Sequence, residues 1–168
     1  LFAIQLAHAH GAEVLVTSSS PEKLQRAAAL GARHLIDRHR EDWASAALRI
    51  TGGQGVDHVL EIAGGANLGE SAKVVTGFGR ISLIGVLAGQ EISSPAHYLL
   101  TKNVTVQAIG TGPQRALEAL VRAVDAIGLK PVIDSRHRFE DLPQALARLD
   151  AGPFGKIVID VAQATSGA

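Results

Sequence analysis

The sequence contains no cysteine and no methionine, and only 4% of its 168 residues are aromatic. The absence of cysteine excludes disulfide bonds, thiolate nucleophiles and thiolate zinc ligands within this chain. No hydrophobic run approaches the roughly 20 residues that span a bilayer, and no signal-peptide pattern opens the chain. We therefore expect a soluble protein with a cytoplasmic location as the default.

An excess of charge of one sign is also lacking, because 16 Lys and Arg residues balance 16 Asp and Glu residues. No net field attracts nucleic acid or an anionic membrane, so any anion site must be local. We expect a small-molecule substrate and neither nucleic acid nor membrane as a partner. With 46% hydrophobic and 19% charged residues, the composition indicates a packed globule and excludes a disordered or coiled-coil protein.

Predicted strands and helices alternate along the chain, and the strands are nearly continuous runs of Val, Ile and Leu. This pattern is typical of a parallel sheet covered by helices on both faces, the α/β doubly wound fold. The predicted strands are 13–17, 34–37, 56–62, 80–84, 104–109, 131–133 and 156–161. The predicted helices are one already under way at 1–7, then 21–30, 41–50, 67–75, a longer one beyond 113 with an apolar stripe over 117–127, and 141–149.

Ligands of open parallel sheets bind at the carboxyl ends of the strands. After the first predicted strand come Thr17, Ser18, Ser19 and Ser20, and Lys23 follows one helical turn later. A carboxylate at the end of this strand would accept a hydrogen bond from a ribose hydroxyl and repel a 2′-phosphate. The segment from Thr17 to Ser20 contains no carboxylate. The segment therefore favours NADP(H) over NAD(H). The alternative is that Ser20 merely caps the helix and Lys23 lies on a solvated face.

Two other strand ends carry candidate cofactor-binding residues. Arg38, after the second strand, could join the same phosphate site, or it could be an ordinary surface cation. Gly64 and Gly85 close two later strands and would let a ligand approach the backbone, with the amides of Val86 or Leu87 as donors. The alternative reading is that both are ordinary turn glycines.

The seven histidines show no spacing typical of metal ligands. No nucleophile elbow, Walker loop or HExxH motif is present either. We identify neither a catalytic residue nor a metal ligand in this chain.

Several segments together are typical of one known family. They are LFAIQLA at 1–7, GAEV at 11–14, TSSSPEKL at 17–24, ALGA at 29–32, TGGQGVD at 51–57, GRISLIG at 79–85 and FGKIV at 154–158. They resemble the medium-chain dehydrogenases/reductases, which include zinc-type alcohol dehydrogenases and quinone reductases. The resemblance spans nearly the whole chain and implies a Rossmann-type parallel sheet plus a C-terminal segment of the catalytic domain.

The resemblance also implies a division of the chain and a set of roles. Residues 1–112 would form an NADP(H)-binding Rossmann domain, incomplete at its N-terminus, and 113–162 would complete the catalytic domain, followed by a frayed tail at 163–168. Ser19 and Lys23 would hold the 2′-phosphate, with Arg38 where relatives commonly have tyrosine. Gly64, Gly85 and Val86 would lie along the nicotinamide half.

The chain starts at Leu1 without methionine, so we expect a fragment. By the resemblance, the first strand, the glycine loop and a catalytic domain with any zinc ligands would lie upstream. In the strand order 3-2-1-4-5-6 the absent strand is central, so that either a partner replaces it or the sheet is rearranged.

These considerations leave two functional hypotheses. In the first, a full-length homo-oligomeric parent, expected to be a dimer, transfers hydride between NADP(H) and a small alcohol, carbonyl, enone or quinone, and this chain alone is inactive. In the second, the chain is a non-catalytic nucleotide-binding fragment that self-associates or is completed by a partner. Another doubly wound enzyme, such as a methyltransferase, is disfavoured by the acid-free serine segment.

Overall fold

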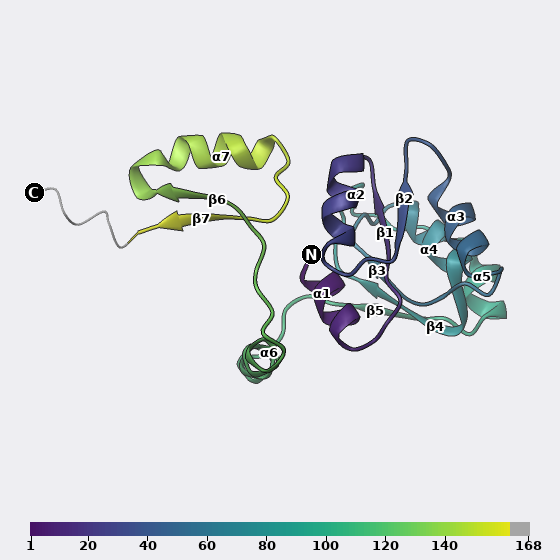
Figure 1. The fold of residues 1–168 in the computed structure, drawn as a ribbon. Coiled ribbons are helices and arrows are strands. Elements are labelled where there is room, and N and C mark those ends of the chain that lie inside the picture. The colour runs from purple at the N-terminus through teal and green to yellow at the C-terminus, as the bar shows by residue number, and fades with distance from the viewer. Residues whose placement is uncertain (162–168) are drawn as a thin grey trace, which may run out of the picture.

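The computed structural model describes residues 1–161 and has the predicted alternation of helices and strands (Figure 1). The strands are β1 (Leu15–Ser18), β2 (His34–Asp37), β3 (Val56–Glu61), β4 (Val75–Leu83), β5 (Thr105–Ala108), β6 (Ile133–Arg138) and β7 (Lys156–Asp160). The helices are α1 (Phe2–Ala9), α2 (Pro21–Ala28), α3 (Trp43–Ile50), α4 (Asn67–Val74), α5 (Ala96–Thr101), α6 (Gln114–Ile127), the 3-10 turn η1 (Phe139–Asp141) and α7 (Leu142–Asp150). Within these residues no helix is long and apolar enough to cross a membrane.

The strands form three sheets in which every pair is parallel. Their orders are β1-β2, β3-β4-β5 and β6-β7. Over residues 1–161, no strand of the first sheet is paired with a strand of the second. This break falls where the expected sheet lacks its central strand, and the strands on either side keep the expected neighbours. The expectation that the sheet might be rearranged is therefore wrong.

Strand β1 shows that the fold is doubly wound. Val14 and Val16 pack against a cluster that contains residues of α1 and α2, including Ile4 and Ala27. Leu15, between them, packs against the cluster formed by α3, α4 and Ile36 of β2. Because successive residues of a strand point to opposite faces, helices cover both faces of this sheet.

The three-stranded sheet is centred on β4. Ile81 and Val75 of β4 are fully buried against Leu68 and Ala72 of α4, and residues of α5 complete the cluster. Strand β4 starts directly at the end of α4, several residues before the predicted start at 80. Val56 pairs with Val75 but His58 pairs with Arg80, so the intervening residues of β4 bulge out of the ladder.

Two further predictions for individual elements differ from the structure. The strand predicted at 131–133 is wrong, because β6 covers Ile133–Arg138. Its residues are mostly polar and only partly buried, so no hydrophobic run marked them. Helix α5 was not predicted at all, and none of its residues is buried.

The last part of the chain forms a small unit of β6, α7 and β7, called here the C-terminal unit. Its buried residues include Ala145 and Phe154. Asp134 of β6 accepts two hydrogen bonds of 2.7 Å from the Arg148 guanidinium and one of 3.0 Å from the Phe154 amide. These hydrogen bonds hold the Asp134 pKa at about 2, with the side-chain bond to Arg148 as the largest cause.

Helix α6 joins the two parts of the molecule and is the least buried long element. It ends at Gly128, whose φ of +65° suits glycine. None of its residues is buried, and its apolar stripe, which includes Leu117 and Val121, is exposed. The tail predicted at 163–168 lies outside the described residues.

Candidate functional site

The predicted phosphate residues lie at the adjacent carboxyl ends of β1 and β2. Ser18 is the register partner of Asp37, and the Arg38 amide donates to the Ser18 carbonyl at 3.0 Å. Thr17, Ser19 and Arg38 are exposed. The structure therefore brings the hydroxyl-rich segment and the Arg38 side chain to one accessible edge, as the parallel pairing predicted.

Two serine hydroxyls at this edge already accept local hydrogen bonds. The Ser20 hydroxyl accepts from the Lys23 amide at 3.2 Å and caps α2. This is the capping role that was given above as the alternative to phosphate binding. The Ser18 hydroxyl accepts from the Ser20 amide at 3.2 Å. Ser19, whose side chain makes neither of these bonds, is the exposed hydroxyl best placed to meet a ligand.

Lys23 is directed toward the C-terminal unit. Its ammonium donates to the Gly152 carbonyl at 2.7 Å. One turn later along α2, Arg26 stacks on the Phe154 ring, with 4.2 Å from its guanidinium carbon to the ring centroid. Helix α2 is thus tied to the loop between α7 and β7. An ammonium has three donors, so the bond to Gly152 leaves Lys23 two more.

Asp37 is the only carboxylate within the predicted phosphate segment of β2. Its side chain accepts from the His39 amide at 2.9 Å and forms an ion pair of 3.4 Å with Arg40. Because Arg40 balances its charge locally, the repulsion that Asp37 would exert on a nearby phosphate is reduced.

The second predicted group lies at the carboxyl ends of β3 and β4, where two loops meet. Gly64 has a φ of +70°, and a Cβ there would lie 2.9 Å from the Cα of Val86 and 3.0 Å from the Gly85 carbonyl. A Cβ on Gly85 would lie 2.5 Å from the Ile62 carbonyl oxygen. Both glycines are therefore required because the two loops touch, whether or not a ligand binds beside them.

Polar and apolar groups face outward from this junction. The Leu87 amide points to the Ile62 carbonyl at a long 3.5 Å, whereas the Val86 amide makes no hydrogen bond within residues 1–161. The side chains of Ile62, Ile84, Val86 and Leu87 are all exposed, Leu87 at 83%. The junction thus presents an amide donor surrounded by apolar surface.

Sequence reasoning missed Glu61, the last residue of β3. It is only 2% exposed, and its carboxylate accepts from the amides of Ala63 and Gly64 and from the side chains of Asn67 and Ser71. The available signal was a carboxylate that ends a hydrophobic strand directly before a glycine pair. Charged residues are rarely fully buried, so such a position is informative.

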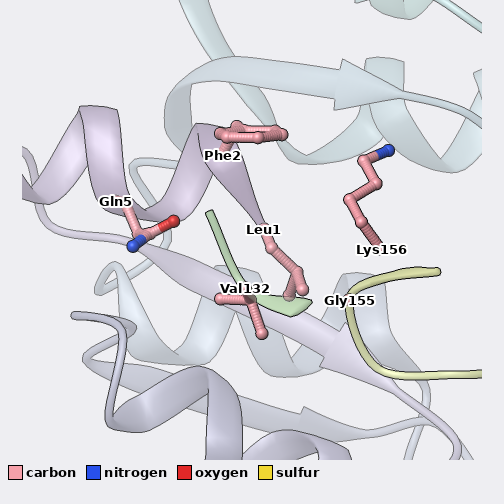
Figure 2. Close-up of a pocket in the computed structure, with 6 residues that line it drawn as sticks. All are labelled: Leu1, Phe2, Gln5, Val132, Gly155 and Lys156. Atoms are coloured by element: carbon pink, nitrogen blue, oxygen red, sulfur yellow. The ribbon is translucent and has the colours of Figure 1, made fainter. Parts of the chain in front are cut away.

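A pocket of about 150 Å³ lies elsewhere, between α1 and the C-terminal unit (Figure 2). Leu1, Phe2 and Gln5 line one side, and Val132, Gly155 and Lys156 line the other. The Gln5 amide nitrogen donates to the Lys130 carbonyl at 3.0 Å. None of the predicted site residues lines this pocket, and the exposed cation Lys156 was not predicted.

The described residues do not fit a zinc ion. No group of three or more His, Asp or Glu side chains in residues 1–161 is arranged to hold a metal. With no cysteine in the whole sequence, no thiolate can complete a smaller set.

Comparison with known proteins gave consistent matches over almost the whole chain. A family model described as "Zinc-binding dehydrogenase" matches residues 1–126. A curated relative, the zinc-type alcohol dehydrogenase-like protein C1773.06c of Schizosaccharomyces pombe, is 35% identical over 95% of this chain and 48% of its own length. The chain thus spans about half the length of the curated relatives that it matches.

Solved structures show the same fold. A protein of Sinorhizobium meliloti 1021, named provisionally as an alcohol dehydrogenase, matches with a TM-score of 0.90 and 59% identity over 95% of this chain and 47% of its own. A protein named as an NAD-dependent alcohol dehydrogenase matches with a TM-score of 0.84 and 31% identity, again over 95% and 47%. The arrangement of β1 to β7 is therefore that of the second half of such dehydrogenases.

Proposed function

Since the chain belongs to the zinc-binding dehydrogenase family, we propose that it is the NADP(H)-binding part of an oxidoreductase. The proposed enzyme transfers hydride to or from a small alcohol, carbonyl, enone or quinone. Residues 1–112 form its cofactor domain in this proposal, and 113–162 contribute to its catalytic domain. The concentration of the buried clusters in β1 to β5 and the exposed apolar stripe of α6 support this division.

The choice of NADP(H) depends on one observation, the edge formed by Thr17, Ser18, Ser19 and Arg38, where no carboxylate directly follows β1. Hydroxyl donors and a guanidinium suit a dianionic phosphate, and a guanidinium can bind it with two parallel hydrogen bonds. Lys23, in the first turn of α2, adds a further cation when it shares its donors between Gly152 and the phosphate. The ion pair of Asp37 with Arg40 reduces the repulsion between that carboxylate and the phosphate.

The nicotinamide half is assigned to the junction of the β3 and β4 loops. There Gly64 and Gly85 leave no side chain in the way, and the Val86 amide has no partner within the described residues. Val86 and Leu87 would hold the carboxamide and the face of the ring. Bound NADP(H) would supply or accept the hydride, and these residues would orient it and exclude water with their exposed apolar side chains.

Cofactor preference tests the proposal directly. In the gene product that contains this chain, we expect NADPH to bind more tightly than NADH, with adenosine 2′-phosphate competing better than adenosine. Lys23→Ala or Arg38→Ala should weaken NADPH binding by about 1–3 kcal/mol and hardly change NADH binding. Arg33→Ala, an exposed arginine just before β2, is the control that removes a charge away from this edge.

Isothermal titration of each variant with both nucleotides decides the outcome. Equal losses for NADPH and NADH would contradict the phosphate assignment. A preference for NADH in the unchanged protein would contradict the choice of cofactor while leaving the oxidoreductase proposal in place.

The open strand edges favour a second candidate, a fragment completed by association. β1 and β3 are not paired with each other, and every residue of the edge strand β5 is exposed. Unpaired edges promote association with another strand. We propose a homodimer as the functional form, and a purely monomeric mass by sedimentation equilibrium would contradict both the dimer and the self-associating fragment.

A further inference from the structure

We propose that Glu61 is a positioning residue that holds the two strand-end loops in the geometry needed by the nicotinamide half of the cofactor. The inference deepens the proposed function, on which it rests. Its basis is a single buried glutamate that contacts α4 and the first loop of the β3–β4 junction through its side chain and the second loop through its main chain.

The two carboxylate oxygens of Glu61 have separate tasks. Oε1 accepts from the backbone amides of Ala63 at 2.8 Å and Gly64 at 3.0 Å, which fixes the loop that follows β3. Oε2 accepts from the Asn67 side-chain amide at 2.7 Å and from the Ser71 hydroxyl, both on α4. The side chain therefore links this loop to the helix that supports it.

The backbone of Glu61 holds the second loop. Its carbonyl accepts from the amides of Ile84 at 2.8 Å and Gly85 at 3.3 Å, where β4 ends. Farther out, the Ala88 amide donates to the Ala63 carbonyl at 2.7 Å. Glu61 thus contacts the first loop through its side chain and the second through its main chain.

The backbones of the two loops are in direct contact. Gly64 lies so close to Val86 that a Cβ would be 2.9 Å from the Val86 Cα. Closely packed groups transmit displacement instead of absorbing it. A shift of the Gly64 amide, once Glu61 no longer ties the loop to α4, therefore moves Val86, whose amide is the proposed nicotinamide donor.

The charge of Glu61 is unusual for a buried strand end, and hydrogen bonding accounts for it. All four of its partners act as donors, and an ionised carboxylate accepts at both oxygens. No cation forms an ion pair with it among the described residues. Glutamine has the same size but only one acceptor oxygen, so it cannot accept from the loop amides and from the α4 donors at once, and the link between loop and helix is lost.

The test compares a dinucleotide with its adenine half in the gene product that contains this chain. We expect Glu61→Gln to weaken NADPH binding by about ten-fold or more, because a buried donor loses its acceptor. Binding of adenosine 2′,5′-bisphosphate, which lacks the nicotinamide, should change less than about two-fold. The matched control is Asp57→Asn, an exposed carboxylate of the same strand, which should change neither affinity.

A second variant keeps the inference testable if Glu61→Gln does not fold. Ser71→Ala retains the charge and removes one donor, so we expect the same selective loss of NADPH binding on a smaller scale. A purely structural role would lower both affinities by the same factor. Equal losses, or no loss in either variant, would overturn the inference.

The outcomes also separate this inference from the proposed function. An unchanged protein that binds no nicotinamide nucleotide overturns the proposed function and the inference with it. If the unchanged protein prefers NADH, only the choice of cofactor fails, and the comparison is repeated with NADH and ADP. Selective loss of the dinucleotide in Glu61→Gln then still supports the positioning role.

Discussion

Residues 1–109 and residues 113–160 carry similar hydrophobic patterns but bury them to different extents. In the first region, β1 to β5 and their helices form three buried clusters. In the second region, α6 buries none of its residues, and the C-terminal unit buries only a few, including Ala145 and Phe154. Amphipathic spacing thus indicates which face of a helix needs a partner, but it does not say whether the partner lies in the same segment.

The difference is clearest for two aliphatic residues of the same size. Ile81 of β4 is fully buried between α4 and α5, whereas Leu117 of α6 is 62% exposed. Ile81 belongs to a hydrophobic strand and Leu117 to the apolar stripe of α6. Substitutions at these positions, together with one in the C-terminal unit, therefore measure how far the two regions differ.

The largest effect is expected for Ile81→Ala. Removing a fully buried aliphatic side chain should lower the free energy of unfolding by about 2–5 kcal/mol, because the transfer energy is lost and a cavity remains. Urea denaturation followed by the fluorescence of Trp43, which packs against the first cluster, measures the change. A loss below about 1 kcal/mol would show that the core around β4 is not closely packed.

An intermediate, pH-dependent effect is expected in the C-terminal unit. Because Arg148 lowers the Asp134 pKa from 3.8 to about 2, the contact stabilises the folded state above pH 3.8. Its contribution is lost as the pH falls through the pKa of about 2. Asp134→Asn should abolish this dependence and weaken the unit at neutral pH. Amide shifts of β6 and β7 during an acid titration report the result, and an unchanged titration in the variant would contradict it.

The smallest effect is expected for Leu117→Ala in α6. A side chain this exposed contributes little to burial, so the free energy of unfolding should change by less than about 0.5 kcal/mol. The same urea titration measures it, with Ile81→Ala as the comparison. A loss approaching that of Ile81→Ala would mean that another part of the gene product covers the stripe.

Much of the first region could be predicted from the sequence because its local signals agree with its packing. Ser20 and Pro21 begin α2 where expected, and β2 covers the predicted residues 34–37. The doubly wound α/β fold and the family resemblance are both confirmed. The roles proposed for Ser19, Lys23 and Arg38 remain predictions.

The rest could not be predicted because it depends on tertiary contacts. The polar strand β6 is held by pairing with β7 rather than by a hydrophobic run. The hydrogen bond between Lys23 and Gly152 joins positions far apart in the chain, and no local sequence pattern indicates it. Glu61 was missed although its four donors lie close in sequence, because they converge on its carboxylate only when β3, the following loop and α4 have folded.

The parallel pairing of neighbouring strands has a consequence for how the chain folds. Every ladder in residues 1–161 joins strands that are consecutive in the sequence, as Leu15 with His34 and Ile81 with Val106 illustrate. Closing a short loop costs less conformational entropy than closing a long one. Each strand can therefore find its neighbour soon after leaving the ribosome, and no ladder has to wait for a distant segment.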